Sequence, residues 1–296
     1  NNGMLLTAAR HVFTPSQDAA RRIAAFAPSA KVLTVPHTDA PHEAQLPALQ
    51  VPPLAAGDNL RVVVLGALSM IKGADVLEAV AMEAAKKGIK IEFHLLGFGY
   101  RNLLTQPRAA LTVHGAYEEK DLPQLLQWLK PHLVWFPAQW PETYSYTLSA
   151  SLLQGLPVAV PDIGAFAERV AGREWSWVMP WDETPAQWLQ WFARIRDDHF
   201  ATSTSPKPPA APSFVQPLPD FDYQRDYLAG LPDKSLPQAL PLATLAEHAT
   251  RSTAATGMRS DALNHLARLR SMPVFRGVAR MIPASTQRKV KNWLLR

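Results

Sequence analysis

Short apolar runs alternate with amphipathic stretches from residue 60 onwards. Six runs rich in β-branched and large apolar residues predict strands, at residues 60–66, 89–97, 111–115, 132–137, 156–161 and 175–179. Apolar positions at helical spacing predict the helices between them, at residues 74–88, 118–130, 143–154, 163–172 and 184–198. Because the runs are continuous, they indicate strands buried on both faces. The pattern therefore predicts an α/β fold, a Rossmann-like doubly wound parallel sheet of about six strands.

Pro-rich stretches separate this unit from its flanks. A strand, helix and strand are expected at 11–16, 17–26 and 31–36, before a Pro-rich connector. We predict four segments: a partial N-terminal domain with its linker (1–58), the sheet unit (59–200), a Pro/Ser-rich linker (201–220) and a helical C-terminal extension (221–296). Helices are expected in the extension near 259–271 and 284–295. The first residues are typical of mid-protein sequence, which indicates a fragment of a longer protein.

Composition and charge narrow the class of protein. The chain is 47% apolar and 19% charged, which is typical of globular proteins. Its net charge of +5 is unevenly placed: residues 251–296 hold ten basic residues and one acid, which leaves the rest at −4. No nucleic-acid motif is present, so no nucleic-acid partner is expected for the body. The absence of cysteine excludes disulfides and fits a reducing compartment.

Turns at three predicted strand ends carry the candidate chemistry. GALSMIKG spans Gly66 to Gly73 with Lys72 near the next helix, and GFGY follows the second strand from Gly97. PAQWPE ends at Glu142, just before a predicted helix start. The carboxyl ends of parallel strands meet at one edge of a sheet, where ligands bind. Main-chain N–H groups at the helix start and the Lys72 ammonium suit a diphosphate, and Glu142 suits hydroxyls.

Each of these features has a plainer interpretation when it stands alone. A lysine after a glycine turn is typically a solvated surface residue, and a G-x-G after a strand is a weak motif. Glu142 near a helix start is also favourable to the helix dipole. Their succession at the ends of strands in one sheet is the stronger signal, and together they indicate a nucleotide-sugar site.

The same residues carry a resemblance to a known family. Residues 60–198 resemble the donor-binding domain of the retaining, GT-B-fold glycosyltransferases of family 4 (group 1 type). The family's G-R-L-x-x-x-K-G turn corresponds to GALSMIKG, its L-x-x-x-G-x-G strand end to HLLGFGY, and its E-x7-E stretch with G-x-P-V to ETYSYTLSASLLQGLPV. The spacing from Glu142 to Gly155 follows the family pattern without a gap. VFTPSQDAARRI and VLTVPH resemble the end of the family's N-terminal acceptor domain.

The resemblance implies roles for matching positions. It implies catalytic roles for Lys72, on the donor diphosphate, and for Glu142, on hydroxyls of the transferred sugar. It places the phosphate-binding helix start at Tyr144, Ser145, Tyr146 and Thr147, and further donor-binding positions at Gly66, Ala67, Gly97, Gly99, His114, Gly115, Tyr117 and Ala150. Neither a metal nor another cofactor is implied, and the nucleotide-diphosphate sugar is a substrate.

Three positions depart from the family pattern. Ala67 stands where the family has an arginine that assists the lysine, and Ser145 stands where glycine is usual. Ala150 stands at the second glutamate, eight residues after Glu142, which in the family binds the ribose hydroxyls. Losing one charge-assisted hydrogen bond costs about 1.5–3 kcal/mol. These departures predict a weakened donor site or one specialised for another donor.

Other residues add little to this picture. The histidines lack metal-ligand spacing, and the serines of residues 145–151 lack a nucleophile elbow, so metal and hydrolase chemistry are not expected. His94 and His114 are expected in strands, with His114 at the edge of the pocket. The basic, apolar segment 272–296 has two interpretations: a helix docked on the body, or contact with an anionic membrane surface. With the resemblance, this implies a cytoplasmic protein, peripheral to the inner face of a membrane in the second case.

These expectations combine into one functional prediction and its rivals. The chain is predicted to be the donor half of a retaining glycosyltransferase of surface-polysaccharide synthesis, acting on a glycan or lipid-linked acceptor. Without its N-terminal acceptor domain the chain is expected to bind donor weakly and transfer nothing. A nucleotide-sugar epimerase of GT-B fold is a rival that the ETYSYTLSA stretch argues against. A non-catalytic binding or scaffold module of a multi-domain glycosyltransferase is the other alternative, favoured by Ala67 and Ala150.

Overall fold

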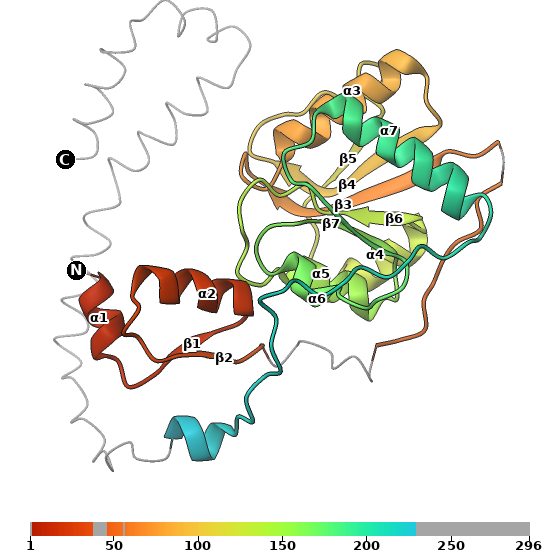
Figure 1. Ribbon diagram of the computed structural model, residues 1–296. Helices are drawn as coiled ribbons and strands as arrows, with labels where there is room; N and C mark the ends of the chain where they lie inside the picture. The colour runs from red at the N-terminus through yellow and green to blue at the C-terminus, as the bar shows by residue number, and fades with distance from the viewer. Residues whose placement is uncertain (1, 38–45, 56, 229–296) are drawn as a thin grey trace, which may run out of the picture. The chain divides into compact units, whose positions relative to one another are not determined.

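The computed structural model describes residues 2–37, 46–55 and 57–228 (Figure 1). The chain divides into two compact units, residues 1–221 and 222–296. In the second unit the described residues form one π-helical turn, η4 (Tyr223–Leu228). The helices predicted near 259–271 and 284–295, and the basic segment 272–296, lie outside the described residues.

Six parallel strands form the main sheet of the first unit. Their order across the sheet is β5-β4-β3-β6-β7-β8. Their bounds are β3 (Leu60–Leu68), β4 (Ile91–Gly99), β5 (Leu111–Gly115), β6 (Leu133–Trp135), β7 (Val158–Pro161) and β8 (Ser176–Met179). All neighbouring pairs are parallel, which confirms the predicted α/β fold with its doubly wound sheet.

Helices cover both faces of this sheet (Figure 1). On one face α3 (Ala74–Lys87) and α7 (Pro185–Ile195) pack against the strands, and a π-helical turn, η3 (Arg196–Phe200), continues α7. The other face carries α4 (Leu122–Leu129), α5 (Tyr146–Leu153) and α6 (Phe166–Arg169), and the short 3-10 helix η2 (Glu119–Asp121) leads into α4.

The central strand β3 shows why the apolar runs are continuous. Val62 and Val64 lie in the core beneath α3 and α7, whereas Val63 and Leu65 lie in the core beneath α4, α5 and α6. Side chains alternate between the faces of a strand, so a strand covered on both sides needs apolar residues at every position. Burying each such side chain contributes about 1.5–3 kcal/mol.

Helix ends follow local sequence signals. Thr184 begins α7 with a capping box, in which its hydroxyl accepts from Gln187 N and the Gln187 side chain accepts from Thr184 N. Gly88 ends α3 in the left-handed conformation that suits glycine. The predicted helix over 143–154 is shorter than expected. It begins at Tyr146, because Ser145 has a positive φ of 81° and therefore lies outside the helix.

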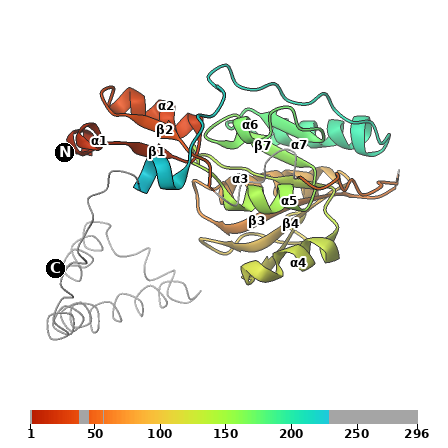
Figure 2. The ribbon, with the colours of Figure 1, turned by 90° about the horizontal axis from the view of Figure 1, so that it is seen from below.

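A smaller strand-helix-strand module precedes the main sheet. It consists of α1 (Asn2–Ala8), β1 (Val12–Thr14), α2 (Gln17–Phe26) and β2 (Val32–Thr34), and β1 pairs with β2 in parallel. Figure 2 shows α2 lying alongside the two strands. The strand, helix and strand expected here are confirmed, but α1 was not predicted.

The strand order defines where a ligand would enter. Numbered from β3 along the chain, the order is 3-2-1-4-5-6. The chain moves outward from β3 in one direction through β4 and β5, and then in the other direction through β6, β7 and β8. The crevice at the carboxyl ends of β3 and β6 is therefore the topological switch point, which is the usual ligand site of such sheets.

Within the part of the chain that the structure describes, no helix combines the length and apolar character needed to cross a membrane.

Candidate functional site

Two loops meet at the switch point and are joined by main-chain contacts. The loop from β3 to α3 accepts a hydrogen bond from the loop after β6, through Gln139 N and Ile71 O at 2.8 Å. Gly73, with φ +83°, lies so close to the second loop that a Cβ would stand 2.0 Å from Pro137 O. Only glycine fits this contact, so the two loops hold each other in place.

Lys72 and Glu142 come from these two loops and lie side by side. Their Nζ and Oε1 atoms are 3.8 Å apart, and the side chains are 52% and 23% exposed. An ion pair this exposed contributes little to stability, so the loops rather than the pair fix the geometry. The Lys72 ammonium therefore remains able to exchange its partner for a stronger anion.

The turn between β7 and α6 supports Glu142 from behind. Ala165 N donates to Glu142 O at 2.9 Å. Gly164 has φ +68°, and a Cβ there would lie 2.6 Å from both Glu142 N and Glu142 O. This support was not predicted, although a glycine soon after a predicted strand is a signal for close backbone approach.

A pocket of about 300 Å³ lies beside the Gly66 turn. Its lining comes from the ends of β3 and β4, the connection from β5 to α4, and the first turns of α5. The lining residues are Gly66, Ala67, Gly97, Phe98, Ala116, Tyr117, Glu119, Leu122, Tyr146, Thr147 and Ala150. Seven of these eleven residues were predicted as donor-binding positions, whereas Phe98, Ala116, Glu119 and Leu122 were not.

Glycines form the floor of this pocket where β3 and β4 end. Gly66 and Gly97 are register partners, with φ values of +98° and +137°. A Cβ on Gly97 would lie 2.0 Å from Gly66 O, so a side chain cannot be accommodated there. The two strand ends thus expose bare backbone to the pocket, which permits close approach by a ligand.

The start of α5 forms another side of the pocket. The first N–H groups of a helix have no acceptor within it. Ser145 Oγ accepts from Leu148 N at 3.4 Å, while Tyr146 and Thr147 line the pocket. Ser145 has φ +81° and ψ +92°, a conformation that glycine adopts readily and serine seldom does. This is the position where the resemblance leads one to expect glycine.

Tyr144 points away from this pocket. Its side chain is buried, its hydroxyl accepts from Ser149 Oγ at 3.2 Å, and the Arg169 guanidinium lies 4.1 Å from its ring centroid. Arg169 also donates to Tyr144 O and Ser145 O, at 3.0 and 2.8 Å. Arg169, which the sequence analysis did not single out, thus fixes the backbone that enters α5.

His114 is not among the residues that line the pocket. Its Nε2 lies 3.1 Å from His94 Nδ1, and its ring contacts Trp128 edge-on. His94 Nε2 lies 3.5 Å from Glu92 Oε1, and Arg61 Nε donates to the same oxygen at 2.7 Å. His94 and Arg61 lower the pKa of Glu92 to about 2, against the effect of its burial. Burial and the nearby His94 lower the pKa of His114.

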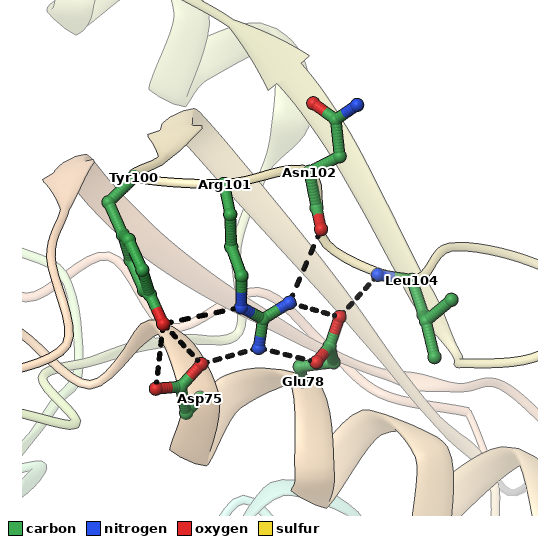
Figure 3. A network of polar contacts seen from close by, with 6 residues as sticks. All are labelled: Asp75, Glu78, Tyr100, Arg101, Asn102 and Leu104. Atoms are coloured by element: carbon green, nitrogen blue, oxygen red, sulfur yellow. Dashed lines mark hydrogen bonds and ion pairs between the residues drawn. The ribbon is translucent and has the colours of Figure 1, made fainter. Parts of the chain in front are cut away.

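Two further predicted glycines, Gly99 and Gly115, are also absent from the lining. A polar network lies directly after Gly99 and holds the chain against α3 (Figure 3). Arg101 contacts Asp75 and Glu78, and the Tyr100 hydroxyl donates to Asp75 at 3.2 Å. Glu78 also accepts from Leu104 N at 2.5 Å.

This network fixes the backbone that follows β4. The hydrogen bond from Arg101 is the main cause that lowers the pKa of Glu78; burial opposes it, and the hydrogen bond from Leu104 N lowers the pKa further. The hydrogen bonds of Arg101 with Glu78, Tyr100 and Asp75 raise its pKa, so this cation stays charged. The ion pair of Arg101 with Glu78 therefore anchors the C-terminal end of β4 to α3. The sequence analysis missed it, because its residues belong to two elements far apart in the chain.

Among the described residues, no three His, Asp or Glu side chains gather in a way that could hold a metal ion.

Comparisons with known proteins concern the fold. No family model and no curated protein matches the sequence. Sucrose-phosphate synthase from Thermosynechococcus elongatus is similar at a TM-score of 0.47 and 16% identity, over 67% of this chain and 51% of the synthase. Anabaena HepE in complex with UDP-glucose gives 0.46 and 18%, over 66% of this chain and 56% of HepE.

A third solved structure is the C-terminal domain of LpcC, a group 1 family glycosyl transferase from Francisella tularensis. It gives a TM-score of 0.36 and 14% identity, over 50% of this chain and 78% of that domain. This chain spans about half the length of the synthase and of HepE.

Proposed function

We propose that this chain is the donor half of a retaining glycosyltransferase and binds a nucleotide-diphosphate sugar. One observation carries the proposal: Lys72 and Glu142 lie 3.8 Å apart at the switch point of a 3-2-1-4-5-6 parallel sheet, next to the start of α5. An ammonium and helix N–H groups are ligands for a diphosphate, and a carboxylate beside them is a ligand for sugar hydroxyls.

The chemistry assigned to these groups is electrostatic. When the bond between the sugar and the diphosphate breaks, negative charge develops on the departing oxygen. Lys72 and the N–H groups of Tyr146 and Thr147 are oriented before the reaction, so they stabilise this charge without reorganisation. Glu142 accepts hydrogen bonds from the sugar and orients it. The acceptor and its binding residues belong to the rest of the longer protein that we propose.

A non-catalytic binding module is the second candidate, and one observation favours it. Ala67 and Ala150 both line the 300 Å³ pocket, at positions where the family has an arginine and a glutamate. Two lost polar contacts of about 1.5–3 kcal/mol each would weaken a donor considerably. Such a module would retain the fold of the donor half without binding a nucleotide sugar.

The test is a thermal-shift titration of the chain with UDP, GDP, ADP and their glucose conjugates. Ligand at about 100 times Kd stabilises a protein by about 2.7 kcal/mol, so a donor raises Tm by several degrees. Lys72→Met removes the ammonium and should weaken binding roughly 10- to 100-fold, as expected for a charge-assisted contact.

Lys87→Met is the matched control for this experiment. Lys87 is 46% exposed and pairs with Glu83 at 3.0 Å, but it lies in the last turn of α3. The proposal expects Lys87→Met to bind like the unmodified chain. A response to none of the six ligands would contradict the proposal and favour the non-catalytic module. Turnover of a nucleotide sugar by this chain alone would contradict the view that it is only the donor half.

A further inference from the structure

The pocket beside the Gly66 turn is apolar over most of its lining. Ala67, Phe98, Ala116, Leu122 and Ala150 contribute apolar side chains to it. A ribose placed against such a wall would lose water from its two hydroxyls without gaining acceptors. Leaving buried hydroxyls unpaired costs about 1–3 kcal/mol each, so a ribonucleotide site needs a polar partner in this wall.

Among the described residues that line the pocket, Glu119 is the one that carries a carboxylate. It opens η2, the short helix between β5 and α4. Leu122, three residues later, is 4% exposed, so the segment is anchored in the core beneath α4. The short helix that carries Glu119 is therefore held close to the core, while the Glu119 side chain is exposed.

Tyr117 and Ala150 line the same pocket as Glu119 and come from the two sides of it that a ribose would meet. Tyr117 also lines the pocket, is half-buried and packs on the same core as Ala150. Burial and the charge of Glu119 raise the pKa of Tyr117. Ala150 comes from α5 and has no atoms beyond Cβ, so it leaves room for a group reaching in from η2.

We propose that Glu119 accepts hydrogen bonds from the ribose hydroxyls and makes the pocket selective for ribonucleotides. This inference rests on the proposed function, because it assigns the nucleoside of the donor to the 300 Å³ pocket. It supplies, from a different element, the carboxylate that is missing at Ala150. Carboxylates accept from hydroxyls more strongly than neutral groups do, which suits a ribose diol.

The experiment compares UDP with 2′,3′-dideoxy-UDP, and GDP with its dideoxy counterpart, by isothermal titration calorimetry. The unmodified chain should bind the ribonucleotide roughly tenfold or more tightly, as expected for one or two charge-assisted hydrogen bonds. Glu119→Gln should weaken the ribonucleotide by a similar factor and leave the dideoxy form unchanged, so that the discrimination disappears.

Two additional variants separate this role from a structural one. Glu118→Gln changes the neighbouring exposed carboxylate, which does not line the pocket, and should keep the full discrimination. The double variant Glu119→Gln with Ala150→Glu places a carboxylate on the α5 side of the pocket. It should restore the discrimination between ribo and dideoxy forms that Glu119→Gln alone loses.

The outcomes distinguish the two proposals. Equal affinity of the unmodified chain for ribo and dideoxy forms, or discrimination that persists in Glu119→Gln, overturns the assignment of Glu119 while the donor-site proposal stands. Binding of none of the six ligands of the thermal-shift titration overturns both proposals.

Discussion

The two halves of the proposed donor site are built differently. The diphosphate and sugar half consists of Lys72 and Glu142, on loops held together by main-chain hydrogen bonds and close glycine contacts. The nucleoside half is a pocket with a mostly apolar lining, in which Ala150 stands at the position of the family's second glutamate. The first half keeps Lys72 and Glu142 but departs from the family pattern at Ala67 and Ser145, and the second half departs from it at Ala150.

This difference indicates which half recognises the parts common to all nucleotide sugars and which half recognises the nucleoside. Any nucleotide sugar carries a diphosphate and a polyol, so the groups that bind these parts have few substitutes. The nucleoside can be held by apolar contact and by a polar group from another element, and Glu119 is the group available.

The largest effect is expected where the two loops of the diphosphate half touch. Gly73→Ala combines a left-handed backbone with a Cβ 2.0 Å from Pro137 O. Strain of about 1–2 kcal/mol and overpacking of about 1–3 kcal/mol should reduce the free energy of unfolding by roughly 2–5 kcal/mol. Equilibrium urea denaturation measures this loss.

Gly88→Ala is the control, because Gly88 has φ +60° and a Cβ added there would have no atom within 4 Å. It should lose only the backbone contribution, about 1–2 kcal/mol. Equal losses at Gly73 and Gly88 would mean that the contact with Pro137 does not constrain the loops.

Glu142→Gln should separate the sugar from the diphosphate. Without its carboxylate, the chain should bind UDP-glucose or the equivalent responsive conjugate roughly tenfold less tightly, a loss of about 1.4 kcal/mol. Binding of the corresponding nucleoside diphosphate should change little, because Glu142 is assigned to the hydroxyls. Calorimetry on both ligands measures the difference.

Glu83→Gln provides the matched comparison. Glu83 pairs with Lys87 in the C-terminal half of α3, whereas Lys72 precedes the N-terminus of this helix. It should alter neither affinity. A Glu142→Gln variant that loses the diphosphate and the conjugate to the same extent would contradict the division of roles.

The stability of the fold should depend on pH through Glu168, a residue of α6. Burial raises the pKa of Glu168 to about 7, although the N–H groups of Gln17 and Asp18 donate to it and oppose the shift. The folded state then holds this proton more tightly than the unfolded state. The associated stability is complete below about pH 4.5 and is lost as the pH rises through about 7.

The expected contribution is about 1–2 kcal/mol, less than the full shift implies because the side chain keeps some contact with solvent. Urea midpoints measured between about pH 5 and pH 8 test it. Glu168→Gln should flatten this part of the profile, and an unchanged slope in that variant would assign the pH dependence to other groups.

The smallest effect is expected at the entry to α5. Ser145→Gly removes the cost of φ +81°, about 1–2 kcal/mol, and loses a weak cap at 3.4 Å, for which glycine costs only a few tenths. The net gain of about 0.5–1 kcal/mol should raise Tm by about 1–4 °C. A lower Tm would mean that the Ser145 hydroxyl stabilises the turn more than its backbone strains it.

The fold of the main sheet could be predicted from the sequence because the apolar runs of the strands and the helical spacing between them indicated the same α/β pattern. Continuous apolar runs predicted every strand of the main sheet, and the strand end at Gly115 was placed correctly. The helix α1 was missed because it has only seven residues and none of them is buried, so no apolar face marks it in the sequence. The start of α5 was placed too early, because a positive φ at a serine is imposed by surrounding structure and leaves no mark in the spacing of residues.

The candidate site was predictable only in part. Lys72 and Glu142 were expected together because parallel strands end at one edge, and the structure places them so. Arg169 and Gly164 were missed because their contacts join separate segments of the chain, and Glu119 was missed because the pocket that it lines is assembled from four elements. His114 was expected at the pocket, but its side chain contacts His94 on the neighbouring strand. Sequence spacing gives the edge of the sheet that a residue reaches, whereas packing decides which way its side chain turns.

The central claim is that a diphosphate lies against the start of α5 beside Lys72. Amide chemical shifts of the 15N-labelled chain, recorded during titration with UDP, GDP and ADP, test this most directly. At least one of these ligands should move the resonances of Tyr146 and Thr147 along saturable curves, and Lys72→Met should weaken those curves roughly 10- to 100-fold. Saturable binding that leaves both amides unmoved, or curves that Lys72→Met does not change, would contradict the account.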